Sequence, residues 1–402
     1  MTYVQRTICP YDCPTSCGLL AETDGKKILR VKGDKTHPAN KGLICGKMQH
    51  YEESINSEKR ILTPLRRTGK KGSGQFMPIT WEEAGNEIAE RFLNICREDG
   101  PQAILPAVYS GVMGQIQRKC GEAFFNRLGA CSLVLTLCAS AKGAGYSAVA
   151  GKTGCLDPRE LENSDFFLIW GSNIMATRLQ ILPLLARKRK EGKQVILIEA
   201  CGRDSASLCD KAVYIRPGTD GALALAMMHV LWEHLEDEDF LRNQADGYEQ
   251  FLPEIRKATP EWAQGITGIP AEVIEELAHV YGKAKAPAIV LGSGLSRYGN
   301  GGMTVRLITI LSAFTGAWKR PGGGICGCDH NLGDFVDTKR ITRPDLRKEP
   351  ARIVNINQLS SALNAEGKDK IRAFYVYAGN PVNSVCNQTG LLKGVAREDL
   401  FT

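Results

Sequence analysis

Four cysteines near the amino terminus constrain this chain more than any other feature of its sequence. Three residues separate Cys9 from Cys13, three more separate Cys13 from Cys17, and Cys45 follows at a distance. Zinc knuckles usually supply their ligands in two short pairs, whereas one run of three thiolates with a distant fourth suits a cluster. The spacing therefore favours an iron–sulfur cluster, with a zinc knuckle or a set of unrelated buried thiols as the alternatives.

Composition narrows the class of protein. The chain has 402 residues, 14 cysteines and a formal net charge of +7. There is no amino-terminal apolar run and no stretch of about eighteen uncharged apolar residues, so we expect a cytoplasmic protein without membrane insertion. In that setting the cysteines fit reduced thiols and metal ligands better than disulfides. The basic residues behind this modest net charge are interspersed with acidic residues, so no nucleic-acid partner is expected.

Short period-two segments occupy the first part of the chain, at residues 18–22 and 28–32, and predict a small domain of strands. Thr80 followed by Glu83 forms a capping box, which predicts a helix that opens a new domain. From there apolar strands alternate with amphipathic helices, the pattern of a parallel α/β fold.

Four predicted strands stand out in that region, at residues 166–170, 195–198, 288–291 and 374–377. Most of them run directly into glycine turns, which let backbone amides approach a ligand at the carboxyl edge of a sheet. The segments FFLIWGSN (166–173) and FYVYAGNP (374–381) also resemble each other. This similarity indicates two related lobes. The alternative is that the same strand-to-turn pattern recurs by chance, as it does in any α/β protein.

Several ordered motifs together resemble the molybdopterin oxidoreductases, the family of dimethyl sulfoxide reductases, formate dehydrogenases and nitrate reductases. They are CPYDCPTSC, GDKTHPANKGLICGK, ITWEEAGNEIAERF, WGSN, IRPGTDGALALAM, GSGLSRYGNGG, RLITILSAFTGAWKRPGGG and YAGNP. The resemblance covers essentially the whole chain. It implies a catalytic subunit with a [4Fe–4S] cluster and molybdenum or tungsten bound by two molybdopterin guanine dinucleotides.

The resemblance also implies roles for individual residues. The cluster ligands would be Cys9, Cys13, Cys17 and Cys45. Lys47 would lie between the cluster and one pterin, and Cys138 would bind the molybdenum or tungsten, because soft sulfur suits such a metal. Cys131 and Cys155 are the alternatives to Cys138.

The nucleotide ends of the cofactor would lie at the glycine turns. By resemblance Asp220 would recognise guanine, since a carboxylate accepts two hydrogen bonds from the guanine edge, and Glu199 would contact a ribose. The remaining contacts would come from Gly171, Ser172 and Asn173 at one nucleotide and from Gly379 and Asn380 at the other.

The fold implied by the resemblance is α/β, with a small iron–sulfur domain followed by two Rossmann-like parallel-sheet lobes. The expected domains are residues 1–64 for the cluster, residues 65–132 with 320–402 for the first lobe, and residues 133–319 for the second. The carboxyl-terminal barrel domain of the family is absent from the sequence, so we expect a fragment or a split-gene product, with a separate chain supplying that domain.

Two departures from the family bear on the reaction. Ala139 follows Cys138 where formate dehydrogenases have histidine, which makes formate oxidation less expected. The loop after residue 324 lacks their arginine, and Asp329 and His330 are candidates there. The expected function is electron or oxygen transfer at the metal with a ferredoxin-like electron-transfer subunit as partner. The alternatives are a tungsten-dependent hydratase and a non-catalytic iron–sulfur subunit.

Overall fold

The computed structural model describes residues 1–402 apart from residues 110, 112–113, 203, 233 and 329–334. The chain divides into two compact units, one formed by Met1–Leu137 with Phe335–Thr402 and the other by Cys138–Asp334. Both units combine helices with parallel strands, which confirms the predicted α/β class. Within the described residues, the helices are all too short or too polar to cross a bilayer.

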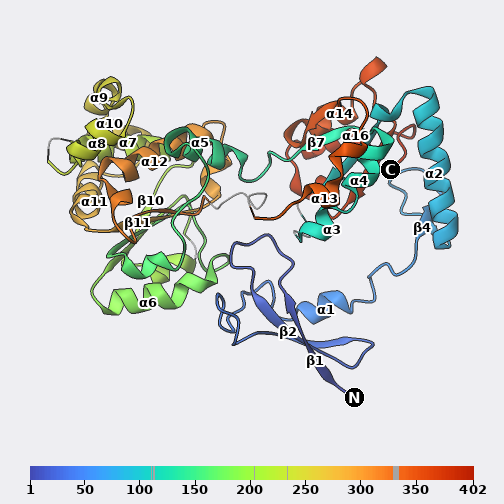
Figure 1. The fold of residues 1–402 in the computed structure, drawn as a ribbon, viewed down its shortest axis with the longest axis horizontal. Helices are drawn as coiled ribbons and strands as arrows, with labels where there is room; N and C mark the ends of the chain where they lie inside the picture. The colour runs from blue at the N-terminus through green and yellow to red at the C-terminus, as the bar shows by residue number, and fades with distance from the viewer. Residues whose placement is uncertain (110, 112–113, 203, 233, 329–334) are drawn as a thin grey trace. The chain divides into compact units, whose positions relative to one another are not determined.

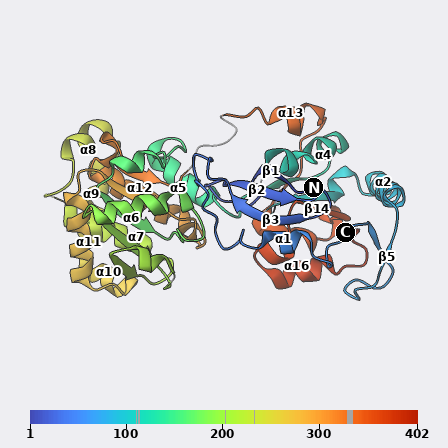
Figure 2. The same cartoon turned by 90° about the horizontal axis from the view of Figure 1, so that it is seen from below.

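The first unit begins with a ribbon of three antiparallel strands, β1 (Tyr3–Ile8), β2 (Gly18–Thr23) and β3 (Ile28–Gly33) (Figure 2). These strands confirm the two predicted period-two segments. Leu19 and Val31 point inward and pack with Met48 in a small core of their own. The ribbon is therefore stabilised locally, and β1 and β2 are joined by the loop that carries three of the four cysteines.

Helix α2 (Trp81–Glu98) starts at the predicted capping box. The hydroxyl of Thr80 accepts a hydrogen bond of 3.1 Å from the Glu83 amide, and the Glu83 carboxylate accepts one of 2.7 Å from the Thr80 amide. Phe92 and Ile95 bury the inner face of this helix. The other elements of the first unit are α1 (Tyr51–Ile55), β4 (Leu65–Arg67), β5 (Phe76–Pro78), β6 (Ile104–Val108), α3 (Gln115–Lys119), α4 (Glu122–Leu128), β7 (Ser132–Val134), α13 (Lys339–Thr342), β13 (Ile353–Asn355), α14 (Leu359–Leu363), β14 (Ala373–Tyr377), α15 (Pro381–Ser384) and α16 (Gln388–Val395).

Parallel pairing joins distant parts of the chain in this unit. Strand β14 pairs with β6, and β13 pairs with β7. The last residues continue beside β14, where Phe374 donates a backbone hydrogen bond to Phe401 and Phe401 donates one to Arg372.

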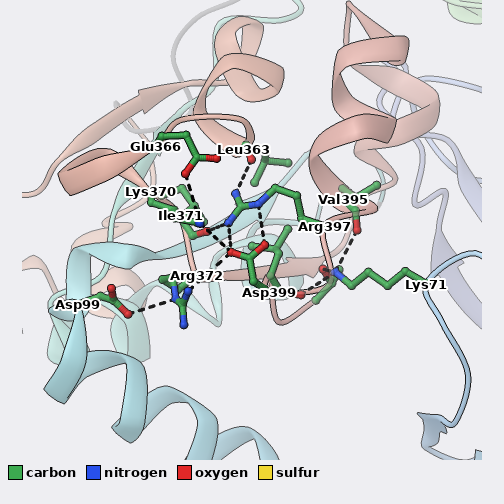
Figure 3. Close-up of polar contacts among 12 residues, drawn as sticks. Lys71, Asp99, Leu363, Glu366, Lys370, Ile371, Arg372, Val395, Arg397 and Asp399 are labelled. Atoms are coloured by element: carbon green, nitrogen blue, oxygen red, sulfur yellow. Dashed lines mark hydrogen bonds and ion pairs between the residues drawn. The ribbon is translucent and has the colours of Figure 1, made fainter.

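Polar contacts fix this carboxyl-terminal segment (Figure 3). The Asp399 carboxylate pairs with Arg397 at 2.7 Å and with Lys370 at 3.1 Å, and these cations hold the pKa of Asp399 well below its usual range. From the loop after β4, the Lys71 ammonium donates to the carbonyls of Val395 at 3.0 Å and Leu400 at 2.6 Å.

The second unit is built on a five-stranded sheet in the order β10-β9-β8-β11-β12. All four pairings are parallel. The strands are β8 (Phe166–Trp170), β9 (Gln194–Glu199), β10 (Lys211–Tyr214), β11 (Pro287–Leu291) and β12 (Gly324–Cys326). Its helices are α5 (Ser140–Ala150), α6 (Leu182–Lys190), α7 (Asp220–Leu231), α8 (Glu238–Gln244), α9 (Tyr248–Lys257), α10 (Pro260–Thr267), α11 (Ala271–Lys283) and α12 (Gly301–Phe314).

Strand residues alternate between the two faces of this sheet, because side chains in a strand point to opposite sides in turn. Leu168 and Ile198 pack with α7 and α12 on one face. Phe167 and Leu197 pack with α6 on the other. Figure 1 shows α6 on the opposite side of the sheet from α7 and α12. Both faces are covered, which explains why the central strands are continuous apolar runs.

The second unit extends beyond residue 319, the end predicted for the second lobe from the sequence. Strand β12 pairs with β11 through Ala288 and Gly324, Ile289 and Ile325, and Val290 and Cys326. Three residues are too few for periodicity to reveal a strand, and only the pairing places this one in the sheet.

Candidate functional site

The loop between β1 and β2 gathers three of the four amino-terminal cysteines. The Cys9 amide donates a hydrogen bond of 2.8 Å to the Cys17 carbonyl, so the hairpin closes around the loop. Ser16 has a φ of 45°, a left-handed conformation that turns the chain back toward β2. Cys17 is buried, and Cys9 and Cys13 are half-buried.

Asn40 connects the fourth cysteine to this loop, a role that no sequence motif indicated. Its side chain accepts a hydrogen bond of 2.9 Å from the Gly18 amide and donates one of 3.2 Å to the Gly18 carbonyl and one of 2.8 Å to the Leu43 carbonyl. Asn40 is fully buried. The segment that leads to Cys45 is therefore fixed beside the residue that follows Cys17.

Glycine is required where the same segment crosses β3. A Cβ atom on Gly33 would lie 2.1 Å from the Gly42 carbonyl oxygen. Contacts this short are not tolerated, so the close approach depends on the absence of a side chain. The crossing brings residues 42–45 against the end of the ribbon.

The four thiols influence one another. Burial, followed by the neighbouring Cys13, Cys9 and Cys45, raises the pKa of Cys17 to about 11, and burial also raises the pKa of Cys9. Thiols with raised pKa values are protonated at neutral pH, so thiolates here require a bound metal centre. Within the described residues, no group of three or more His, Cys, Asp or Glu side chains is arranged so that it could hold a metal ion.

Lys47 is exposed, and its ammonium lies 5.8 Å from the centre of the Tyr11 ring. Tyr11 in turn packs edge to face against Tyr51, with 5.7 Å between ring centres. Contact with an aromatic face orients the lysine beside the cluster loop.

The carboxyl edge of the five-stranded sheet holds the first predicted nucleotide turn. Gly171, directly after β8, has a φ of 58°, and Gly292, directly after β11, lies so close that a Cβ atom there would be 1.7 Å from the Gly171 carbonyl oxygen. The two turns are thus packed backbone against backbone. Ser172 is buried, and the Asn173 side chain accepts hydrogen bonds from the Ala176 amide at 3.3 Å and the Ser205 hydroxyl at 3.1 Å.

Asp220 and Glu199 lie at the same edge. Asp220 is the first residue of α7 and is buried, and its Oδ1 accepts a hydrogen bond of 2.8 Å from the Trp170 indole. Burial raises the pKa of Asp220, while the indole hydrogen bond opposes the shift. Glu199 ends β9 and accepts a hydrogen bond of 2.9 Å from the Ala200 amide. One Asp220 oxygen is therefore already engaged within the protein.

Cys138 precedes α5 and is half-buried. Its sulfur accepts a hydrogen bond of 3.4 Å from Nη2 of Arg297, and its carbonyl accepts one of 3.1 Å from the Ser296 hydroxyl. Sequence reasoning missed both residues, which lie in the GSGLSRYGNGG motif. The Arg297 guanidinium and the Ser296 hydroxyl therefore hold Cys138 in place at its sulfur and at its backbone.

The turn with Gly379 and Asn380 belongs to the other unit and follows β14. A Cβ atom on Gly379 would lie 2.5 Å from the carbonyl oxygen of Tyr109, so the ends of β6 and β14 also meet backbone to backbone. The Asn380 carbonyl accepts hydrogen bonds from the amides of Asn383 and Ser384 at 3.1 Å. Asp329 and His330 lie outside the described residues.

Comparison with known proteins decides the family. A model described as "Molybdopterin oxidoreductase" matches residues 60–402, and a model of the "Molybdopterin oxidoreductase Fe4S4 domain" matches residues 2–57. The chain belongs to the molybdopterin oxidoreductase family. The predicted resemblance is confirmed.

Comparison with individual proteins supports the same family assignment. It is 38% identical to "Probable oxidoreductase YoaE" of Bacillus subtilis (strain 168), over 99% of this chain and 58% of that protein. It is 32% identical to "F420-dependent formate dehydrogenase subunit alpha" of Methanocaldococcus jannaschii, over 80% of this chain and 47% of that protein. The chain thus spans about half the length of these curated relatives. The solved structure of "Acetylene Hydratase from Pelobacter acetylenicus" shares the fold, with a TM-score of 0.83 and 22% identity over 99% of this chain and 60% of that one.

Cys131 and Cys155, the alternatives to Cys138 as the metal ligand, have different hydrogen-bond partners. Cys131 is buried in the core of the first unit, where its thiol donates a hydrogen bond of 2.8 Å to the Gln102 carbonyl. Burial raises the pKa of Cys131 to about 11. The Cys155 sulfur accepts a hydrogen bond of 3.2 Å from the Gly327 amide. The Cys138 sulfur, by comparison, accepts its hydrogen bond from the Arg297 guanidinium at 3.4 Å.

Proposed function

We propose that this chain carries a [4Fe–4S] cluster on Cys9, Cys13, Cys17 and Cys45 and takes part in a molybdenum- or tungsten-dependent redox reaction. The main support for this proposal is the geometry of the cluster loop. Three cysteines lie in one closed hairpin loop, and Asn40 fixes the segment that leads to the fourth. When bound, the cluster would supply one-electron transfer, and the metal cofactor would supply two-electron chemistry at the substrate.

Cys138 is proposed to hold the molybdenum or tungsten. Arg297 keeps a positive charge 3.4 Å from the sulfur, and Ser296 fixes the backbone of the same residue. These contacts orient the thiol, which is the role expected of residues that support a metal ligand.

The cofactor is proposed to be a pair of molybdopterin guanine dinucleotides. The backbone of Gly171, Ser172 and Asn173 would approach one nucleotide at the edge of the sheet, with Glu199 at the ribose and the second Asp220 oxygen at the guanine. Gly379 and Asn380 would serve the other nucleotide. The glycine contacts support this assignment, because both turns leave room only for backbone.

Lys47 is proposed to lie between the cluster and one pterin, where its ammonium would favour negatively charged reduced states electrostatically. A ferredoxin-like electron-transfer subunit is the proposed partner, and the family relative named as a subunit alpha supports an assembly of several chains. Ala139 in place of histidine argues against formate as the substrate of this chain.

Replacement of Cys138 tests the metal assignment without reference to a substrate. C138A is expected to reduce the molybdenum or tungsten content of the anaerobically purified chain at least tenfold and to leave its iron content unchanged. C120A is the matched control, because Cys120 is exposed and its thiol donates a hydrogen bond to the Gln117 carbonyl. Full retention of the heavy metal in C138A would exclude Cys138 as its ligand.

A further inference from the structure

Two buried cations lie at the carboxyl edge of the second unit without a partner among the carboxylates that the structure describes. Lys142 on α5 is 6% exposed, and Arg178, in the segment that follows β8, is 4% exposed. Neither residue forms an ion pair with any carboxylate that the structure describes. Buried charges are ordinarily paired, because leaving water is costly for an ion without a counter-charge.

Lys188 shows what a paired buried cation looks like in the same unit. It is 8% exposed, comparable with Lys142, but its ammonium lies 3.5 Å from Glu191 and 4.0 Å from Glu162. Lys142 instead donates to the Ser293 hydroxyl at 3.2 Å and to the Gly327 carbonyl at 2.6 Å, both of them neutral acceptors. Arg178 donates to the Cys326 sulfur at 3.9 Å, a weak contact.

Both cations converge on Gly327, directly after β12. The Lys142 ammonium binds the carbonyl of Gly327, and Nη2 of Arg178 would lie 3.1 Å from a Cβ atom placed on the same residue. A larger residue than glycine would therefore crowd the guanidinium. The two charges come from different elements, α5 and the segment after β8, and meet at one turn of the sheet edge.

Unused donors remain on both side chains. An ammonium has three N–H groups and a guanidinium five, and the contacts above use two on Lys142 and one on Arg178. No nitrogen of either residue is among the fully buried atoms that lack an acceptor in the described structure. Both side chains therefore keep N–H groups beyond those that bind the neutral acceptors above.

We propose that Lys142 and Arg178 form a binding site for an oxyanion at the carboxyl edge of the five-stranded sheet. A guanidinium binds two oxygens of a phosphate or carboxylate at once, and an ammonium adds a compact charge. The Gly171 and Gly292 turns lie at the same edge, where backbone amides approach phosphates in α/β proteins. The oxyanion has two conceivable sources that share this chemistry, a phosphate of the nucleotide cofactor and a free oxyanion substrate.

The site also borders Cys138. Lys142 binds the Ser293 hydroxyl, and Ser296 donates both to the Ser293 carbonyl at 2.9 Å and to the Cys138 carbonyl at 3.1 Å. A charge held at Lys142 is thus connected through one short turn, Gly294–Ser296, to the proposed metal ligand.

Inorganic phosphate is the probe for the first experiment, with the full chain produced in a host that cannot make molybdopterin. Calorimetric titration at constant ionic strength is expected to show phosphate binding to the wild type, with binding weakened at least tenfold in K142M and in R178M. K188M is the control and is expected to bind phosphate within twofold of the wild type. Absence of phosphate binding by the wild type, or equal binding by all four proteins, would overturn the proposal.

Stability without phosphate separates an anion site from a structural role. If the two cations form an anion site, replacing either one removes a buried charge that has no counter-charge in the free protein. The melting temperature of K142M or R178M in chloride buffer is therefore expected to stay the same or rise. Phosphate should then raise the melting temperature of the wild type and of K188M, and should not raise that of K142M or R178M. Failure of both variants to fold, or their marked destabilisation in chloride, would show that the cations support the fold instead.

The cofactor-loaded chain distinguishes the two sources. If the site holds a cofactor phosphate, the loaded chain no longer binds added phosphate, and K142M and R178M lose pterin at least severalfold. If it holds a free oxyanion, the loaded chain still binds phosphate and the pterin content is unchanged. A chain that binds phosphate but never acquires pterin or iron would refute the proposed function and leave the oxyanion site standing.

Discussion

The side chain of Asn40 binds the backbone of Gly18 in both directions, since it accepts a hydrogen bond from the amide at 2.9 Å and donates one to the carbonyl at 3.2 Å. This pairing imitates one step of a β-ladder and connects the segment that carries Cys45 to the strand that follows Cys17. The geometry of the proposed cluster site therefore depends on a residue that binds no metal.

Replacement of Asn40 is expected to empty the cluster site. N40A leaves the buried Gly18 amide and two carbonyls without this partner, which should cost about 2–3 kcal/mol in local stability. Iron content after anaerobic purification is expected to fall at least severalfold. N56A is the control, because Asn56 also binds a backbone carbonyl, that of Ile28, but is exposed. Normal iron content in N40A would show that the segment with Cys45 is held by other contacts.

Gly292 is expected to tolerate no side chain. In G292A the new methyl group would overlap the Gly171 carbonyl, 1.7 Å away, and the two turns would have to separate. Overpacking of this kind should lower the free energy of unfolding by at least about 3 kcal/mol. Urea unfolding measures this loss, with G299A as the control, since a Cβ atom on Gly299 meets nothing within 4 Å. Similar stability for the two variants would contradict the packing of Gly171 against Gly292.

Asp220 should make stability depend on pH in a definite direction. Because burial raises its pKa in the folded chain, the neutral form is favoured on folding. Its contribution is therefore fully present below the ordinary carboxyl pKa and is lost as the pH rises through the raised value. The stability of the cofactor-free wild type relative to D220N is expected to fall from acid to neutral pH.

Asp157 provides the opposite sign for comparison. Hydrogen bonds from the Arg159 guanidinium lower the pKa of Asp157, so its contribution is present above the ordinary carboxyl pKa and is lost in acid. Relative to D157N, the wild type should gain stability as the pH rises. Parallel pH profiles for D220N and D157N would refute the burial of the Asp220 carboxylate.

Lys71 is expected to anchor the carboxyl-terminal segment (Figure 3). Its ammonium also donates to the Thr402 hydroxyl at 3.0 Å, in addition to the carbonyls of Val395 and Leu400. K71M should weaken this attachment by about 1–2 kcal/mol and speed proteolysis after residue 395. K70M changes the adjacent exposed lysine and should leave the cleavage rate unchanged. Equal rates in K71M and wild type would show that the other contacts of the segment hold it without Lys71.

The sequence was sufficient to predict the elements that have a strong local signal. The predicted strands at residues 166–170, 195–198, 288–291 and 374–377 are confirmed as β8, β9, β11 and β14, each within one residue. The Thr80 capping box is confirmed as well. These features depend on neighbours in the sequence, and periodicity and capping report on such neighbours directly.

Features that depend on distant partners could not be predicted. Asn40 looked like an ordinary loop residue, and only its position beside Gly18 shows its role. No sequence motif marked Lys142 or Arg178. A buried cation is recognised by the charges around it in space, and the sequence alone does not show these. Cys138 is separated from Cys131 by resemblance alone, and the contact between Arg297 and the Cys138 sulfur joins residues far apart in the sequence.

Metal and pterin analysis of the anaerobically purified wild-type chain tests the central claim most directly. We expect about four iron atoms per chain, consistent with the matched Fe4S4 domain, together with molybdenum or tungsten and pterin. Iron should disappear from variants of Cys9, Cys13, Cys17 or Cys45, while the heavy metal should depend on Cys138. A chain that contains zinc in place of iron, with no pterin, would contradict the account.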